Sequence, residues 1–206
     1  MLDLRAMARR LPPPRPRRGS PAETRARLVE AAARLFNRDG FHGTDSNRIA
    51  RAAGYAPGSF YKHFPDKRAI FLEAYEGWVT AEWQAVERVI AAGGSAEVTA
   101  ARIVALLLAF HRRWRGFRAS LRVLVATDAA ARRSHRRQRV RQLKLLREMR
   151  LRLGSGARSA EEDALLLFTL ERVCDAAADG ELGDLGLSTA AMVRRLEGLV
   201  RDQLGA

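Results

Sequence analysis

Apolar residues recur at helical spacing along almost the whole chain. In the first such stretch, Leu28, Ala31, Ala32, Leu35 and Phe36 share one face of a helix. No segment alternates apolar and polar residues between turn signals over the length of a strand. The pattern therefore predicts an all-α chain.

Capping residues and glycines mark where the helices begin and end. Ser20-Pro21-Ala22-Glu23 is a capping box with proline at the first helical position, and Gly40 ends that helix. Further on, the helical pattern is interrupted at Gly93-Gly94, at Gly154-Ser155-Gly156 and at Gly180. The expected helices cover approximately residues 21–39, 45–53, 57–63, 66–92, 97–114, 117–128, 130–153, 159–179 and 188–204.

The most informative segment is residues 40–71, where two short helices are separated by Gly54. Ile49 and Ala50 give the first of them only a small apolar face, so it must pack on its neighbours. The second, residues 57–63, carries small and polar residues and no acid, which suits a helix that enters a major groove. Two short helices joined by a glycine-centred turn define a helix-turn-helix.

A set of positions in this segment has a specific order and spacing. They are Gly40, Phe41, Thr44, Ile49, Ala50, Ala53, Gly54, Ser59, Phe60, Tyr61, His63, Phe64, Lys67 and Phe71. They resemble the N-terminal signature of the tetracycline-repressor (TetR) family, over the stretch from Thr24 to Tyr75. The resemblance implies a three-helix DNA-binding unit followed by a helical ligand-binding and dimerisation domain.

The resemblance also implies which residues contact DNA. They are Thr44, Ser46, Asn47, Pro57, Gly58, Ser59, Tyr61, Lys62, His63 and Lys67. Thr44 has an alternative role as a helix N-cap. Lys67 mildly opposes the dipole of the helix that it begins, which a phosphate explains more easily than the fold does.

Two positions depart from the family pattern. Ala56 stands where the family has a Ser or Thr N-cap, so the second helix lacks that capping oxygen, and Pro57 compensates in part by fixing φ. Tyr55 stands in place of valine, which predicts a half-buried tyrosine. Both departures make the DNA sequence that the chain reads harder to infer.

The last two helices carry wide apolar faces, and in the family the corresponding helices pair with those of a second subunit. The residues expected in such an interface are Leu166, Leu170, Val173, Met192, Leu196, Leu199 and Val200. A purely intramolecular core is the alternative explanation. A half-site reader of this size gains affinity by spanning two half-sites, which favours the dimer.

Bulky residues are spread over the helices that would enclose a ligand. They are Trp78, Trp83, Phe110, His111, Trp114, Phe117 and Phe168. Aromatic residues at helical spacing also occur in an ordinary core, which is the alternative explanation. The effector expected from the resemblance is a small apolar or amphipathic molecule.

Basic residues are unevenly distributed along the chain, whose formal net charge is +14. Residues 1–20 carry six arginines against one acid, and residues 129–155 carry ten basic groups against one acid. Residues 156–206 carry five basic groups against ten acids. This distribution favours a polyanionic partner, with the C-terminal part turned away from it. A general enrichment in arginine is the alternative explanation.

These observations divide the chain into three expected parts. They are a disordered basic arm over residues 1–19, a helix-turn-helix DNA-binding domain over 20–66 and a ligand-binding and dimerisation domain over 67–206. The arm either lies in a flanking minor groove or is an inert solvated tail.

The basic helix expected over 130–153 is a second candidate for a charged surface. It has an expected apolar side opposite most of its arginines, formed by Leu143, Leu145, Leu146, Met149 and Leu153. We expect an amphipathic helix with a solvated face rather than a second DNA site.

Several classes of function find no support in the sequence. The chain has no P-loop, dinucleotide-binding, zinc-protease or nucleophile-elbow motif, so neither an enzyme nor a cofactor is expected. The four histidines lack metal-ligand spacing. The sole cysteine, Cys174, excludes an internal disulfide and is expected to be a buried apolar residue.

The sequence also lacks a segment that would direct it to a membrane. The longest apolar stretch, residues 103–110, is too short to cross a bilayer, and the N-terminus has no secretory pattern. We therefore expect a cytoplasmic protein.

The expected function is that of a sequence-specific regulator of transcription that binds double-stranded DNA. It would bind a palindromic operator as a homodimer and act as a repressor released by a small-molecule effector; activation instead of repression stays open. One alternative is a nucleoid-associated or RNA-binding protein that relies on charge alone. Another is a DNA-binding member of the family that does not control transcription.

Overall fold

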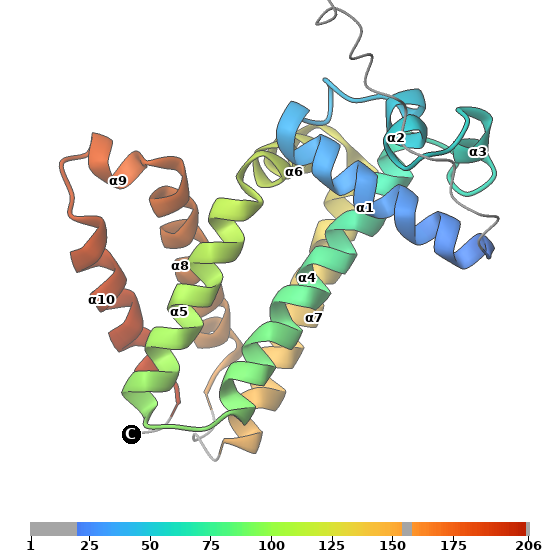
Figure 1. The fold of residues 1–206 in the computed structure, drawn as a ribbon. Helices are drawn as coiled ribbons and strands as arrows, with labels where there is room; N and C mark the ends of the chain where they lie inside the picture. Colours follow the sequence, from blue (N-terminus) through green and yellow to red (C-terminus); the bar gives the residue numbers. More distant parts are fainter. Residues whose placement is uncertain (1–19, 154–157, 205–206) are drawn as a thin grey trace, which may run out of the picture.

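The computed structural model describes residues 20–153 and 158–204. Within these ranges every regular element is a helix, as the periodicity predicts (Figure 1). The helices are α1 (Pro21–Asp39), α2 (Ser46–Ala52), α3 (Gly58–Tyr61), α4 (Lys67–Ala91), α5 (Ala96–Arg113), α6 (Arg115–Thr127), α7 (Ala129–Arg152), α8 (Ala160–Asp179), α9 (Glu181–Asp184) and α10 (Thr189–Arg201). The expected arm over residues 1–19 and the interruption at 154–156 lie outside the described residues.

The start of α1 has the capping box that the sequence predicts. The hydroxyl of Ser20 accepts a hydrogen bond from the backbone N–H of Glu23 at 3.2 Å, and Glu23 Oε2 accepts one from the Ser20 N–H at 2.9 Å. The helix ends at Gly40, whose φ of 74° requires glycine. Both ends of the helix are thus fixed by local chemistry.

One helix was not predicted. The four-residue helix α9 connects α8 to α10, and its only buried residue is Leu182. One turn of helix buries a single side chain, so no apolar repeat marks this helix in the sequence. Gly180, with φ of 85°, ends α8 as expected.

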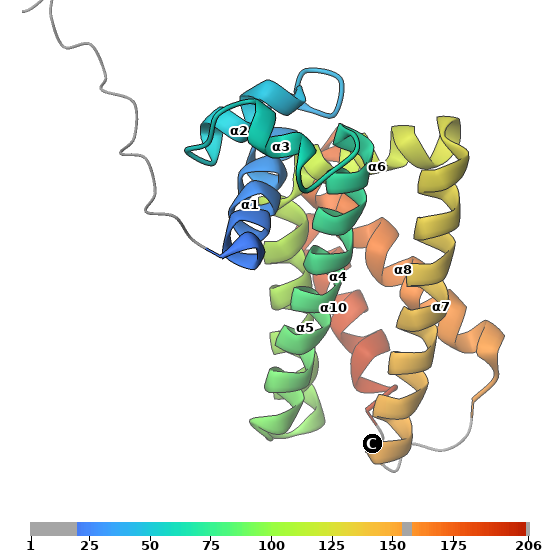
Figure 2. The ribbon, with the colours of Figure 1, turned by 90° about the vertical axis from the view of Figure 1, so that its right-hand side faces the viewer.

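The helices fall into two regions. The helices α1, α2 and α3 gather at one end of the molecule, and α4 runs from that end to the opposite one (Figure 1). The helix α5 returns beside α4, and α8 and α10 pack on α5, while α7 lies along α4 (Figures 1 and 2). The helix α6 crosses back to α1, so it joins the two regions.

The core of the first region includes residues from both sides of the domain boundary expected at 66/67. Phe36 on α1 meets Phe71 on α4, and Phe71 stacks on Phe117 of α6 with 4.4 Å between the ring centroids. All three rings are fully buried. The boundary therefore divides the chain but not this core, which α4 and α6 complete.

The second core lies between α4, α5, α8 and α10. It includes Val86, Val104, Leu196 and Cys174. Cys174 is buried as predicted, and burial raises the pKa of its thiol to about 12. The thiol is therefore unreactive at neutral pH.

The apolar side predicted for α7 is wrong in part. The residues that α7 buries include Gln138, Gln142 and Arg150 alongside Leu146, whereas Leu153 is exposed. Arg150 can be buried because its guanidinium lies 2.5 Å from a carboxylate oxygen of Asp163 on α8, which is buried too. Binary patterning failed here because it assigns every polar residue to the surface.

Candidate nucleic-acid interface and interior cavity

Two turns set the angle between α2 and α3. The side chain of Asp45 caps α2 by accepting a hydrogen bond from the Arg48 N–H at 2.9 Å. Gly54 has φ of 84°, and the Tyr55 N–H then donates to the Ala50 carbonyl at 2.9 Å. Tyr55 is half-buried against the first core, as predicted.

The helix α3 is held in place by two buried aromatic side chains. Phe60 and Phe64 are anchored in the first core, and between them Tyr61 and Lys62 face outward. Tyr61 is 61% exposed. No side chain caps α3, as predicted from Ala56, although the helix begins one residue later than expected, with Pro57 at the N-cap.

The residues predicted to contact DNA divide by exposure. Five are exposed: Asn47, Pro57, Gly58, Tyr61 and Lys62. Four are half-buried: Ser46, Ser59, His63 and Lys67. The exposed members lie on α2, on α3 and on the residues next to α3, so the fold presents them together at one end of the molecule (Figure 1).

The remaining member, Thr44, is buried. Its hydroxyl donates a hydrogen bond to the Gly40 carbonyl at 2.9 Å, within the loop before α2. It is not the N-cap of α2 either, because Asp45 has that role. The side chain of Thr44 thus braces the loop, and any phosphate contact here would fall to its backbone or to its neighbours.

Lys67 has a role in the fold that the sequence did not indicate. Its ammonium donates to the carbonyls of Phe41 at 2.9 Å and Thr44 at 3.0 Å, and it lies 4.4 Å from the centroid of the Phe41 ring. The expectation that a phosphate explains this lysine better than the fold is therefore wrong. A phosphate contact from its remaining N–H stays a prediction.

Sequence reasoning missed Arg25, which fixes the C-terminal end of α3. Its guanidinium donates to the His63 carbonyl at 2.7 Å and to Glu73 at 2.9 Å, and lies 4.2 Å from the centroid of the Phe64 ring. These partners are 38 or more residues away in sequence. No local pattern could have indicated them.

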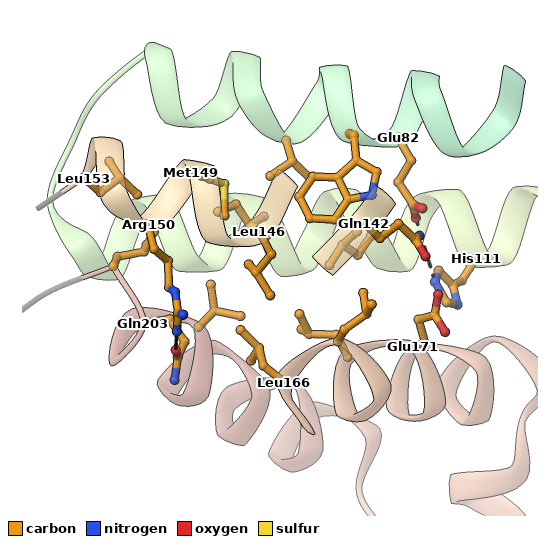
Figure 3. Close-up of a pocket in the computed structure, with 18 residues that line it drawn as sticks. Glu82, His111, Gln142, Leu146, Met149, Arg150, Leu153, Leu166, Glu171 and Gln203 are labelled. Atoms are coloured by element: carbon orange, nitrogen blue, oxygen red, sulfur yellow. Dashed lines mark hydrogen bonds and ion pairs between the residues drawn. The ribbon is translucent and has the colours of Figure 1, made fainter. Parts of the chain in front are cut away.

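The second region encloses an elongated cavity of about 70 Å³ between α4, α5, α7, α8 and α10 (Figure 3). Most of its wall is apolar. Polar groups stand at its two ends: Glu82, His111, Gln142 and Glu171 at one, and Arg150 with Gln203 at the other (Figure 3).

Only two of the residues predicted to bind a ligand, Trp83 and His111, line this cavity. Phe117 belongs to the first core, which Phe110 and Trp114 border. Trp78 packs under the guanidinium of Arg118. Phe168 does not line this cavity, and 53% of it is exposed on α8.

The residues predicted for a subunit interface do not share one surface either. Leu166, Leu170 and Val200 line the cavity, and Leu196 is buried in the second core. Val173 and Met192 are half-buried, and Leu199 is exposed. The outward apolar side chains of α8 are instead Leu165 and Phe168. The sequence indicated two apolar helices but not which side of each faces outward.

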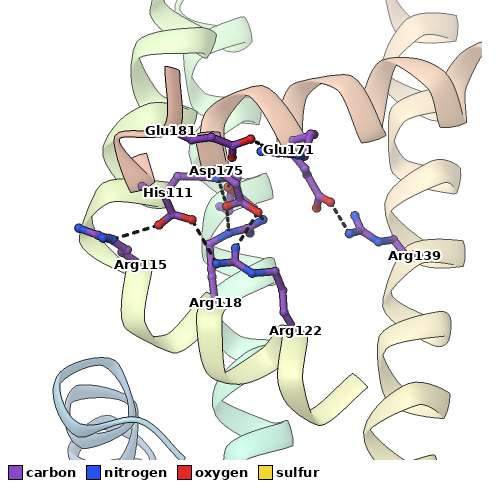
Figure 4. Close-up of polar contacts among 11 residues, drawn as sticks. His111, Arg115, Arg118, Arg122, Arg139, Glu171, Asp175 and Glu181 are labelled. Atoms are coloured by element: carbon purple, nitrogen blue, oxygen red, sulfur yellow. Dashed lines mark hydrogen bonds and ion pairs between the residues drawn. The ribbon is translucent and has the colours of Figure 1, made fainter. Parts of the chain in front are cut away.

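A network of ion pairs connects the cavity to α6 (Figure 4). Asp175 on α8 accepts hydrogen bonds from Arg118 at 2.5 Å and from Arg122 at 3.1 Å, and its Oδ1 lies 2.9 Å from Nδ1 of His111. Although burial acts to raise the pKa of Asp175, the hydrogen bonds from His111 and Arg118 hold it well below its ordinary range. Burial lowers the pKa of His111.

The other side of α6 touches the first region directly. Asn37 at the end of α1 accepts a hydrogen bond from the Phe117 N–H at 3.0 Å, and the Phe41 N–H donates to the hydroxyl of Ser120 at 3.0 Å. A Cβ at Gly116 would lie 2.0 Å from the Asn37 carbonyl oxygen, so only glycine fits. Hydrogen bonds and close packing therefore hold α6 against the end of α1.

Comparison with known proteins supports this division of the molecule. The family model of bacterial regulatory proteins, tetR family, matches residues 28–74, which cover most of α1, all of α2 and α3 and the start of α4. Residues 28–74 thus match the N-terminal domain of the tetR family. The resemblance inferred from the spacing of residues 40–71 is thus confirmed for this TetR domain.

A curated relative agrees over the same segment. The HTH-type transcriptional regulator AcrR of Shigella flexneri is 43% identical over 54 residues, which are 26% of this chain and 25% of the relative. The match thus spans about a quarter of the relative's length.

Solved structures extend the likeness to the fold of the whole chain. A TetR-family transcriptional regulator from a Rhodococcus species superposes with a TM-score of 0.71 at 19% identity, over 89% of this chain and 100% of that one. A transcriptional regulator from Saccharomonospora viridis, solved in complex with choline, gives 0.66 at 21% identity, over 87% and 96%. In the part of this chain that the structure describes, no helix is both long and apolar enough to span a bilayer.

Proposed function

We propose that this protein is a regulator of transcription that binds a palindromic operator as a homodimer and is released from it by a small molecule. The regulator acts in the cytoplasm, where its DNA target lies. The observation that carries the proposal is the polar face of the TetR domain, where Tyr61 and Lys62 project from a helix anchored by Phe60 and Phe64.

The acids near this face act as helix caps, and several basic side chains near it are exposed, which supports binding to a polyanion. Asp45 and Asp66 are both used as helix caps, where their carboxylates accept backbone hydrogen bonds. The nearby Arg51, Lys62 and Arg68 are exposed. Residues 40–68 carry five Lys or Arg residues against two acids, a net charge of +3 that favours a polyanion.

The domain boundaries stay as the sequence suggests: DNA binding over residues 20–66, and effector binding and dimerisation over 67–206. The exposed apolar side chains Leu165 and Phe168 on α8 and Leu199 on α10 are the candidates for the subunit interface. Pairing of two subunits sets the separation of their α3 helices, which must match half-sites about 34–36 Å apart.

The interior cavity supports control by an effector. Its lining includes His111, which the Asp175–Arg118 contacts connect to α6, and α6 packs on α1. A ligand that favours one position of α6 would change the separation of the two reading helices. A protein with this fold was solved in complex with choline, which supports the proposal that the effector is a small organic molecule.

The experiment selects a DNA duplex from a random pool with the full chain and measures its affinity by fluorescence anisotropy. We expect two chains per duplex and a preference over unrelated DNA of about 10³-fold or more. Tyr61→Ala with Lys62→Ala should weaken binding to the selected duplex by at least about tenfold, because base-edge or phosphate contacts are lost. Lys67 is left unchanged because it stabilises the fold.

The matched control is Val140→Ala with Lys144→Ala on α7, which also removes one exposed apolar side chain and one lysine. It should leave the affinity unchanged. Equal affinity for all DNA sequences would instead favour a nucleoid-associated protein. Undiminished binding by the Tyr61 and Lys62 variant would exclude α3 as the reading helix.

A further inference from the structure

In the described part of the chain, the Oε1 atom of Glu82 is buried in the wall of the cavity without a hydrogen-bond partner. Glu82 lies on α4 and is only 6% exposed, and its Oε1 contacts no donor among residues 20–153 and 158–204. Figure 3 shows its side chain pointing toward His111 at the polar end of the cavity. Burying an unpaired carboxylate is costly, which indicates a group that is retained for a ligand.

The atom that faces Glu82 is also a hydrogen-bond acceptor. The Nδ1 of His111 lies 2.9 Å from Asp175 Oδ1, and since an ionised carboxylate can only accept, this nitrogen carries the proton. A neutral imidazole then leaves a lone pair on Nε2, which is 3.9 Å from Glu82 Oε1. That distance is too long for a hydrogen bond between the two.

Above about pH 7, where Glu82 is largely ionised, these two acceptors cannot satisfy each other, and a donor between or beside them would pair with both. Arg118 and Arg139, whose charges act on Glu82, form ion pairs with Asp175 and Glu171. Trp83 also lines this cavity, and an indole ring is a good neighbour for a cation. The chemistry of this end is therefore that of a site for a positively charged donor.

We propose that the effector is a primary or secondary organic ammonium ion whose N–H groups donate to Glu82 Oε1 and His111 Nε2. That an effector exists at all rests on the proposed function. The apolar body of the ion occupies the channel beyond, along Leu146 and Leu166. Gln142 and Arg150 mark the two ends of this channel on α7, eight residues or about 12 Å apart. A linear or narrow body fits better than a broad one.

The test uses three probes that share an eight-carbon chain: n-octylammonium, octan-1-ol and n-octyltrimethylammonium. Binding to the full chain is measured by calorimetry at pH 8. We expect n-octylammonium to bind at least about tenfold more tightly than the other two, since only it combines positive charge with N–H donors. Equal binding of the alcohol or of the trimethylammonium ion would overturn the proposal, as would no binding of n-octylammonium.

The variant Glu82→Gln keeps the shape of the side chain and removes its charge. We expect it to weaken n-octylammonium binding by about tenfold or more and to leave octan-1-ol binding unchanged. Glu87→Gln, on the exposed side of the same helix, is the matched control and should change neither. Circular dichroism confirms that each variant is folded, and unchanged n-octylammonium binding by folded Glu82→Gln would overturn the proposal.

The DNA experiment is kept separate. Affinity for the selected duplex without a probe tests the proposed function, whereas calorimetry without DNA tests the ligand site. Ammonium binding by a chain that shows no DNA preference would leave the site standing and remove the proposed function. A chain that prefers its selected duplex but does not bind n-octylammonium would keep the proposed function and exclude only the ammonium site.

Discussion

The two regions of this molecule bury different kinds of side chain. Around α1–α3 the buried residues are apolar except for Thr44, and the other candidate DNA-contacting residues are exposed or half-buried. Between α4, α5, α7 and α8 the interior holds Glu82, His111, Gln142 and Arg150. A surface that binds DNA can leave its polar groups in water, whereas a cavity that binds a small molecule must bury them. The difference explains why pattern analysis worked in the first region and misplaced residues in the second.

The largest expected effect comes from breaking the buried ion pair of the second region. Arg150→Met leaves Asp163 charged and unpaired, and we expect the free energy of unfolding to fall by about 3–5 kcal/mol. Urea denaturation followed by circular dichroism measures this. Adding Asp163→Leu should restore most of the loss, because no uncompensated charge remains. Arg152→Met, on the exposed side of α7, is the control.

The next effect is a dependence of stability on pH. Burial raises the pKa of Glu82 to about 7 from its ordinary 4.5, so the folded chain holds a proton that the unfolded chain releases. Stability should therefore fall as pH rises from about 4.5 to about 7, by an amount on the order of a few kcal/mol.

The comparison with Glu82→Gln isolates this effect from that of neighbouring groups. His111 acts in the opposite sense, because a lowered pKa makes stability rise with pH up to its ordinary value. Arg118 and Arg139 favour the charged form of Glu82, and Glu171 and Asp175 oppose it. Identical pH profiles of stability for the wild type and Glu82→Gln would contradict the assignment.

The smallest effect concerns the first region, where buried polar contacts run from side chain to backbone. Lys67→Met removes the donor to the Phe41 and Thr44 carbonyls, and we expect a loss of about 1–3 kcal/mol in the free energy of unfolding. Lys62→Met, at an exposed position, should change stability by no more than about 0.5 kcal/mol. Equal stability of the two variants would show that Lys67 is not a structural residue.

The sequence by itself determined the helical class, most helix limits and the TetR domain. These features depend on contacts between residues a few positions apart, such as the Ser20–Glu23 capping box and the turn at Gly54. Spacing in the chain then records spacing in the structure.

Only the tertiary structure decided which side of each later helix faces the cavity. Leu166 and Phe168 are two residues apart on α8, yet one lines the cavity and the other is exposed. Arg150 lies inside because Asp163 on another helix pairs with it, and Glu82 lies inside because several helices leave a cavity beside it. Burial of a charge depends on what surrounds it in three dimensions, and no local pattern of residues contains that information.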